Sequence, residues 1–162
     1  MPATPLFPFG HGLTYTTFAY ANATAPEDQI GTDEETISIG VEVTNTGSLV
    51  GDEVVQLYAS TRATGLTRPT EQLVGFLRLR LKPGETAEVH FDVPLALIAY
   101  LDEERRFVVE SGTVEFLVAS SSDDIRARRS VTLHGPTREL ARHERRFVSS
   151  ASRSAASTAT QT

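Results

Sequence analysis

Hydrophobic and polar residues alternate with a period of two over much of the chain. The first clear run is TISIGVEVTN (residues 36–45), in which every second residue is a branched aliphatic: Ile37, Ile39, Val41 and Val43. Successive side chains of a β-strand point to opposite faces, so this run predicts a strand with one buried face. Turn chemistry follows at residues 45–48, where Gly47 can take a positive φ.

The same extended pattern recurs toward the C-terminus. It predicts further strands at residues 53–60, 73–81, 89–93, 107–110, 114–118 and 127–133. The adjacent Val54 and Val55 favour a strand covered on both faces. A tight Lys-Pro-Gly-Glu turn is expected at residues 82–85, and Pro94 should end a strand because proline cannot donate to a ladder. Only residues 94–101, PLALIAYL, are expected to form a helical turn.

Short strands separated by turns about every 8 to 12 residues, with no long amphipathic helix, are typical of an antiparallel β-sandwich. The pattern therefore predicts an all-β fold, and we place the sandwich at residues 14–134. Residues 135–162 change character to charged and then Ser/Ala/Thr-rich sequence. Such a segment buries little apolar surface, so a disordered C-terminal tail is expected.

The N-terminal stretch PLFPFGHGLTYTTF, residues 5–18, is unusual for a chain end. It holds four aromatic rings around a Gly-His-Gly sequence. Chain termini are normally polar and frayed, whereas this stretch is rich in large apolar side chains. We therefore expect it to pack against another surface.

Composition narrows the classes of function. At 162 residues the chain has room for one domain and a tail, and a net charge of −6 argues against nucleic-acid or anionic-membrane partners. There is no cysteine, which excludes disulfides and thiolate chemistry. No export signal follows Met1, and no apolar run approaches the roughly 20 residues of a membrane helix. The compartment stays open.

Candidate catalytic groups are present but weakly patterned. The acidic runs Asp102-Glu103-Glu104 and Asp123-Asp124 supply carboxylates such as glycoside hydrolysis requires. Adjacent acids between strands are more often solvated loop residues, and neighbours in sequence point apart, so we disfavour catalysis by them.

Histidine, serine and tyrosine give no stronger signal. His11 between two glycines could be exposed for proton transfer, but a hydrogen-bonding spacer at a packing surface is the more common role. His90 is expected to face outward on its strand, and it lies too far from His11 and His143 for a local metal motif. Residues 120–122 lack the setting of a nucleophilic serine, and there is no Gly-rich phosphate loop, so no cofactor or metal is expected. The four tyrosines could stack on sugars, although packing is the commoner use.

Several motifs, in this order, resemble one known family. The segments are PLFPFGHGLTYTTF, then VEVTNTG followed by GDEVVQLYAS, then RPTEQLVGFLRLRLKPGETAEVHFDV, AYLDEERRFVVESGTVEFLVASSSDDIR and SVTL. Together they resemble the C-terminal fibronectin type III-like domain of family 3 glycoside hydrolases, a group of β-glucosidases, β-xylosidases and relatives. The resemblance covers residues 5–133 and implies an immunoglobulin- or fibronectin III-like sandwich.

The resemblance also explains the N-terminal stretch. It implies that residues 1–13 are a linker from a catalytic core, and that the segment is buried between that core and the sandwich. The implied domain-interface residues are Leu6, Phe7, Phe9, Gly10, His11, Gly12, Leu13 and Tyr15. The two glycines would let the backbone bend and approach closely.

The implied function is a non-catalytic accessory domain that packs on and stabilises the core of a β-glucosidase-type enzyme. In the resembling enzymes the catalytic residues belong to two other domains, so no catalytic residue is carried over to this chain. The implied partners are those catalytic domains, with a carbohydrate near an active-site entrance as a further one. We expect the chain to be the last part of a larger enzyme. An independent module that binds carbohydrate or protein through exposed aromatics or a sheet edge is the alternative.

Overall fold

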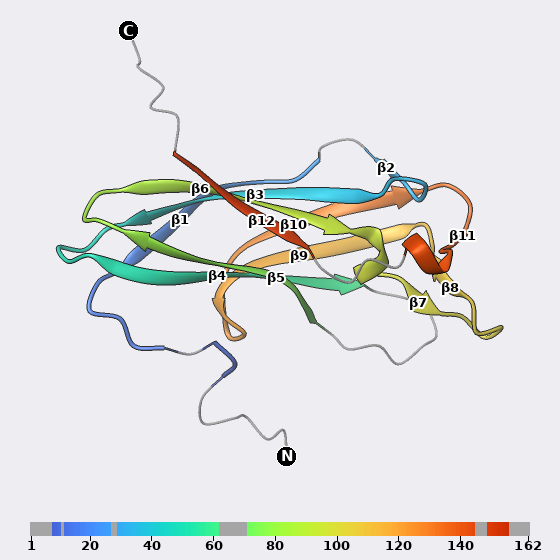
Figure 1. Cartoon of the computed structure of the whole chain (residues 1–162), viewed down its shortest axis with the longest axis horizontal. Helices are drawn as coiled ribbons and strands as arrows, with labels where there is room; N and C mark the ends of the chain where they lie inside the picture. The colour runs from blue at the N-terminus through green and yellow to red at the C-terminus, as the bar shows by residue number, and fades with distance from the viewer. Residues whose placement is uncertain (1–7, 11, 27–28, 62–70, 145–148, 156–162) are drawn as a thin grey trace, which may run out of the picture.

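The computed structural model describes residues 8–10, 12–26, 29–61, 71–144 and 149–155 as an all-β structure. Two sheets stack face to face as a sandwich (Figure 1). The predicted fold class is confirmed. No helix among these residues is long and apolar enough to cross a membrane.

One layer of the sandwich is a four-stranded sheet in the order β1-β3-β6-β12, with antiparallel neighbours. Its strands are β1 (Phe18–Thr24), β3 (Thr36–Asn45), β6 (Thr86–Pro94) and β12 (Ser150–Ala155). Strand β3 contains the alternating aliphatic residues of positions 36–45, and it lies between β1 and β6 in this sheet.

The second layer is a five-stranded sheet in the order β2-β10-β9-β4-β5, antiparallel except for the β2-β10 pair. Its strands are β2 (Ile30–Gly31), β10 (Asp124–His134), β9 (Gly112–Ser121), β4 (Gly51–Thr61) and β5 (Gln72–Leu81). Strand β4 lies between β5 and β9, so both of its backbone edges are paired.

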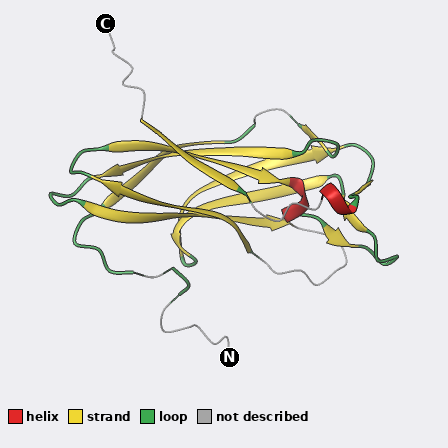
Figure 2. Cartoon of the chain, viewed as in Figure 1, coloured by secondary structure: helices red, strands yellow, loops and turns green. Residues whose placement is uncertain are grey.

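Small elements lie at one end of the sandwich, where Figure 2 shows two short helical turns. A three-stranded sheet joins β11 (Arg138–Glu139), β8 (Phe107–Val109) and β7 (Tyr100–Leu101). The 3₁₀ turns are η1 (Leu95–Leu97) and η2 (Arg142–Glu144). The first confirms the helical turn expected after Pro94.

The main core fills the space between the two large sheets. Alternate residues of β3 and β6 meet alternate residues of β4, β5 and β9, and Phe91 and Phe116 are completely buried among them. A smaller cluster lies on the outer face of the five-stranded sheet, where Tyr58 packs with Leu117 and Ala119. The expectation that the strand with Val54 and Val55 is covered on both faces holds for residues 55–59, which are all buried, but not for Val54, which is exposed.

The C-terminal region differs from the sequence expectation. A disordered tail was expected over residues 135–162, and this is wrong for residues 138–144 and 150–155. Leu140 is buried in the main core, and β12 pairs in antiparallel register with β6, from Ser150 opposite Asp92 to Ala155 opposite Ala87. The reason is backbone pairing: an edge strand can be held by ladder hydrogen bonds without an apolar pattern of its own.

Candidate docking surface

The N-terminal segment, residues 8–10 and 12–17, is held onto the sandwich by a backbone hydrogen bond at the β9-β10 turn. The Ser122 N–H donates to the Phe9 carbonyl oxygen over 2.9 Å. Gly10 follows with φ of +80°, and a Cβ placed on it would lie 2.0 Å from Gln56 Nε2. A position with positive φ and no room for a side chain requires glycine.

Gly10 packs directly against the side chain of Gln56. The Gln56 side chain is buried on the outer face of β4, where Nε2 donates to the Ser120 carbonyl oxygen over 3.0 Å and Oε1 accepts from Tyr58 Oη over 2.6 Å. Both ends of the amide are therefore fixed, and the N-terminal segment meets a rigid surface. Gly12 differs from Gly10, because an added Cβ there would meet nothing within 4 Å.

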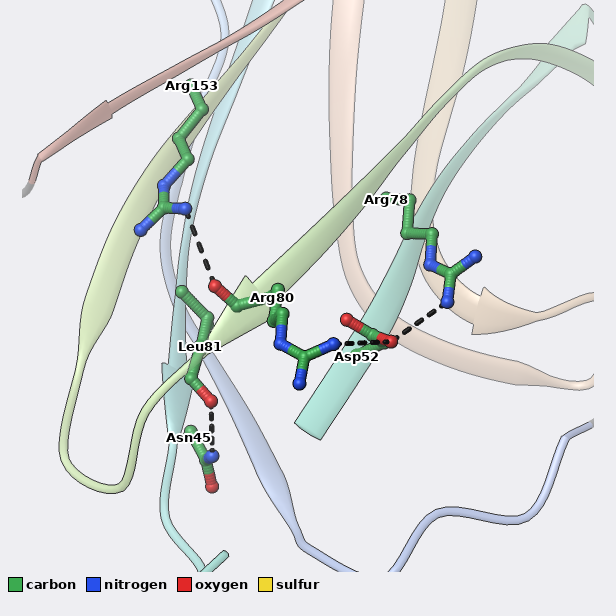
Figure 3. Close-up of polar contacts among 6 residues, drawn as sticks. All are labelled: Asn45, Asp52, Arg78, Arg80, Leu81 and Arg153. Atoms are coloured by element: carbon green, nitrogen blue, oxygen red, sulfur yellow. Dashed lines mark hydrogen bonds and ion pairs between the residues drawn. The ribbon is translucent and has the colours of Figure 1, made fainter. Parts of the chain in front are cut away.

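A second attachment holds the end of the segment at the β3-β4 turn. Thr16 Oγ1 donates to Asn45 Oδ1 over 2.7 Å, and the Thr46 N–H donates to the Thr17 carbonyl oxygen over 2.8 Å. Asn45 is completely buried and also donates to Leu81 of β5, as Figure 3 shows. The segment is thus joined to both sheets through one amide.

Between these two attachments the large apolar side chains of the segment are uncovered. Phe9 is 67% exposed, and Leu13 and Tyr15 are each 96% exposed. The other apolar residues predicted for an interface, Leu6 and Phe7, lie outside the described residues, as does His11. Large apolar groups clustered at the surface are a common mark of a surface that meets another protein part.

A polar groove of about 480 Å³ lies beneath the segment, beside β4, β9 and β10. Glu53 and Arg126 line the groove, and both contact Tyr20 beside it: Tyr20 Oη donates to Glu53 Oε1 over 2.6 Å, and the Arg126 guanidinium lies 5.5 Å from the Tyr20 ring centroid. Burial raises the pKa of Glu53, and burial together with the Glu53 carboxylate raises the pKa of Tyr20. A neutral Tyr20 hydroxyl is thereby kept as a donor.

Asp124, at the same groove, is held in the ionised state. Ser120 Oγ and Arg126 Nη2 donate to its Oδ2 over 2.7 and 2.6 Å, and these bonds lower its pKa. A carboxyl group whose pKa is lowered is unsuited to donate a proton. The groove contains ion pairs and hydroxyls, and its carboxylates have their partners within the domain.

The acidic run at residues 102–104 forms a turn closed by an arginine. Arg106 donates to Asp102 from its backbone N and its Nε, each over 2.8 Å, and its Nη2 lies 2.6 Å from Glu104 Oε2. Although burial opposes the shift, these hydrogen bonds lower the pKa of Asp102. The run is therefore a surface turn held by ion pairs. This agrees with the expectation that adjacent acids between strands are loop residues.

The histidines do not converge on a metal. His90 is partly exposed on the outer face of β6, where Nε2 lies 3.2 Å from Glu88 Oε1, and His143 is in η2 at the end of the sandwich. Within the described part of the chain, no group of three or more His, Cys, Asp or Glu side chains is placed to hold a metal ion.

Sequence reasoning missed the two polar residues that fix the segment, Gln56 and Asn45. A buried amide within an alternating strand pattern is the only local signal that either carries. Their partners are distant in sequence: Ser120 for Gln56, and Thr16 and Leu81 for Asn45.

Part of the chain matches the model of a known domain family. Residues 53–122, from β4 to the β9-β10 turn, match the family model of the fibronectin type III-like domain. The chain carries a fibronectin type III-like domain. Gln56 of β4 and Ser122 of the β9-β10 turn lie in the matched region, whereas Asn45 of β3 lies outside it.

Relatives of this fibronectin type III-like domain are glycosidases. A Probable beta-glucosidase I of Aspergillus fumigatus is 45% identical over 126 residues, which are 75% of this chain and 15% of that protein. A Beta-xylosidase of Formosa agariphila is 43% identical over 125 residues, 76% of this chain and 17% of that protein. The chain therefore spans less than a fifth of the length of either relative.

Solved structures give the same match. The beta-glucosidase 3B of Thermotoga neapolitana, in complex with glucose, superposes with a TM-score of 0.75 at 31% identity over 85% of this chain and 18% of its own. The GH3 beta-glucosidase of Bifidobacterium adolescentis gives a TM-score of 0.70 at 37% identity, covering 78% of this chain and 18% of its own. In each of these enzymes the likeness is to a small part of a longer chain.

Proposed function

We propose that this chain is the non-catalytic accessory domain of a β-glucosidase-type glycoside hydrolase, where it packs on the catalytic core and stabilises it. The relatives are β-glucosidases and a β-xylosidase that are several times longer than the part they share with this chain. The partner of the domain is accordingly the remainder of the same polypeptide. A carbohydrate near the active-site entrance of that remainder is a further partner in this proposal.

The observation that carries this proposal is the state of the N-terminal segment. It is held by the hydrogen bond from the Ser122 N–H to the Phe9 carbonyl oxygen and by the bond from Thr16 Oγ1 to Asn45 Oδ1. Its large apolar side chains, Phe9, Leu13 and Tyr15, are nevertheless exposed. A segment that is anchored but uncovered is pre-organised for a further contact, since little conformational freedom remains to be lost on docking. If the segment links a catalytic core to the sandwich, these side chains would be buried between the two.

The carboxylates support the non-catalytic half of the proposal. Asp102 and Asp124 are each engaged by an arginine, and the pKa of each is lowered. Hydrolysis of glycosides by two carboxyl groups requires one of them to be protonated at the working pH, and that group needs a raised pKa. Glu53 has a raised pKa, but its Oε1 accepts from Tyr20 in a groove beneath the N-terminal segment.

Two measurements test the proposal. The purified chain should not hydrolyse aryl β-glucosides or β-xylosides, and an antibody against the sandwich should detect in the native source a polypeptide several times larger than 17.6 kDa that has glycosidase activity. Hydrolysis by the purified chain would overturn the non-catalytic role. A native band near 17.6 kDa, together with retention of the chain on insoluble glucan, would support an independent binding module instead.

A further inference from the structure

The two outer faces of the sandwich differ in chemistry. On the four-stranded sheet, the outward residues of β3 and β6 are polar and bond to one another: Ser38 with Asp92, and Thr44 with Thr86 over 2.7 Å. Glu42 on the same face accepts from Asn22 over 2.8 Å. This face satisfies its own polar groups and is typical of a surface in contact with water.

The outer face of the five-stranded sheet carries exposed apolar side chains. Phe76 of β5 is 65% exposed and lies directly opposite Gln56 of β4 in the ladder. Directly opposed residues of an antiparallel pair share a face. The Phe76 side chain therefore lies beside that of Gln56, against which Gly10 packs. Val54, two residues before Gln56 on β4, is 39% exposed on the same face.

Five of the eight large hydrophobic side chains that are exposed among the described residues lie in the N-terminal segment or on this sheet face. They are Phe9, Leu13 and Tyr15 in the segment and Val54 and Phe76 on the sheet, whereas Leu49 and Val50 lie in the β3-β4 turn and Leu101 lies in β7. None of them lies on the outer face of the four-stranded sheet. Figure 1 shows the described N-terminal segment passing outside the layer that contains β4 and β5.

Two arginines edge this apolar surface. Arg78 and Arg80 alternate with core leucines on β5, so they face outward with Phe76, and their side chains are 71% and 76% exposed. They share one carboxylate, Asp52, at 2.8 and 4.0 Å, as Figure 3 shows. Two guanidinium groups with one carboxylate leave an excess positive charge, which complements a carboxylate on a facing surface.

We infer that the outer face of the five-stranded sheet, along β4 and β5, is the surface that packs on the catalytic part of the polypeptide. Phe9, Val54 and Phe76 form its apolar centre, and Arg78 and Arg80 meet carboxylates of the core at its rim. This inference rests on the proposed function and adds to it the face used and the chemistry of the opposing surface. The occupant is the rest of the polypeptide because the relatives are several times longer than this chain and the N-terminal segment crosses the same face.

The test compares substitutions at two exposed hydrophobic residues. It uses the full-length native polypeptide that the antibody detects. Phe76→Asp places a charge at the centre of the proposed interface, whereas Leu101→Asp does so at a side chain of similar exposure, 58%, on β7. In the isolated chain both variants should unfold at the wild-type temperature, since both sites are exposed there. In the full polypeptide, Phe76→Asp should lose glycosidase activity at least tenfold faster on heating, and Leu101→Asp should match the wild type.

The outcomes separate the two proposals. Equal heat inactivation of the two variants in a large, active glycosidase would overturn the assignment of the face and leave the accessory role standing. A native polypeptide near 17.6 kDa without glycosidase activity would overturn both. Suppose that Phe76→Asp is inactivated faster than Leu101→Asp and that Arg78→Glu has an effect similar to that of Phe76→Asp. Both the apolar centre and the basic rim would then be supported.

Discussion

Among the polar residues that attach the N-terminal segment to the sandwich, Asn45 should destabilise the domain most when it is replaced by alanine. The side chain is completely buried and makes four hydrogen bonds. Nδ2 donates to the carbonyl oxygens of Leu49 and Leu81 over 2.8 and 2.9 Å. Oδ1 accepts from Thr16 Oγ1 over 2.7 Å and from the Gly47 N–H over 3.0 Å. Asn45→Ala removes all four of these bonds.

The magnitude follows from this count. A hydrogen bond contributes on the order of 1 kcal/mol net, so losing four should lower the free energy of unfolding by about 4 kcal/mol. Small domains are stable by only about 5–15 kcal/mol, so the loss is a large fraction of the total. Thr16→Val removes a single one of these bonds, and the cost should be about 1 kcal/mol, because Asn45 Oδ1 keeps the Gly47 N–H.

Urea unfolding of the purified chain measures the effect. With a denaturant dependence of about 2 kcal/mol per molar urea, Asn45→Ala should shift the midpoint by about 2 M and Thr16→Val by about 0.5 M. Asn45→Asp should resemble the alanine variant, since a carboxylate cannot donate to the two carbonyl oxygens. A shift for Asn45→Ala no larger than that for Thr16→Val would refute the reasoning, because the amide would then be replaceable by water or by relaxation of the turn.

Three further predictions concern the N-terminal segment, the buried carboxyl group and the C-terminal strand. Gly10→Ala should loosen the segment, because its Cβ would meet Gln56, and hydrogen exchange of the Ser122 N–H should quicken. Glu53→Gln should become progressively more stable than the wild type as the pH rises above 4.5, since an acid whose pKa is raised by folding loses stability as it ionises; urea unfolding from pH 4 to 8 measures this. Deleting residues 150–162 should promote self-association, measured by sedimentation velocity, because the edge of β6 would lose its partner strand.

Each of these predictions has a contrary result. Gly12→Ala has open space around its Cβ and should leave the exchange of the Ser122 N–H unchanged; an equal effect of both alanines would mean that Gln56 does not hold the segment. A constant stability difference between Glu53→Gln and the wild type over the pH range would contradict a raised pKa. A truncated chain that stays monomeric at high concentration would show that β12 is not needed to cover the edge of β6.

Much of the sandwich could be predicted from local pattern. The strands with strict alternation, such as β3 and β6, were predicted close to their observed bounds because one buried face imposes a period of two. Strand β1 was missed although Phe18 and Tyr20 alternate with alanines. Its pattern is interrupted at Asn22, which takes a φ of +47°, where the register with β3 shifts.

The sequence alone determined the fold class, the turns and the presence of an apolar N-terminal segment, because periodicity, proline and glycine act over a few residues. Only the tertiary structure decided that β12 pairs with β6, that Gly10 packs against Gln56, and that the exposed Val54 and Phe76 share the outer face of the five-stranded sheet. These features join residues that are far apart along the chain. Their stability comes from backbone ladders and buried amides whose partners no local pattern specifies.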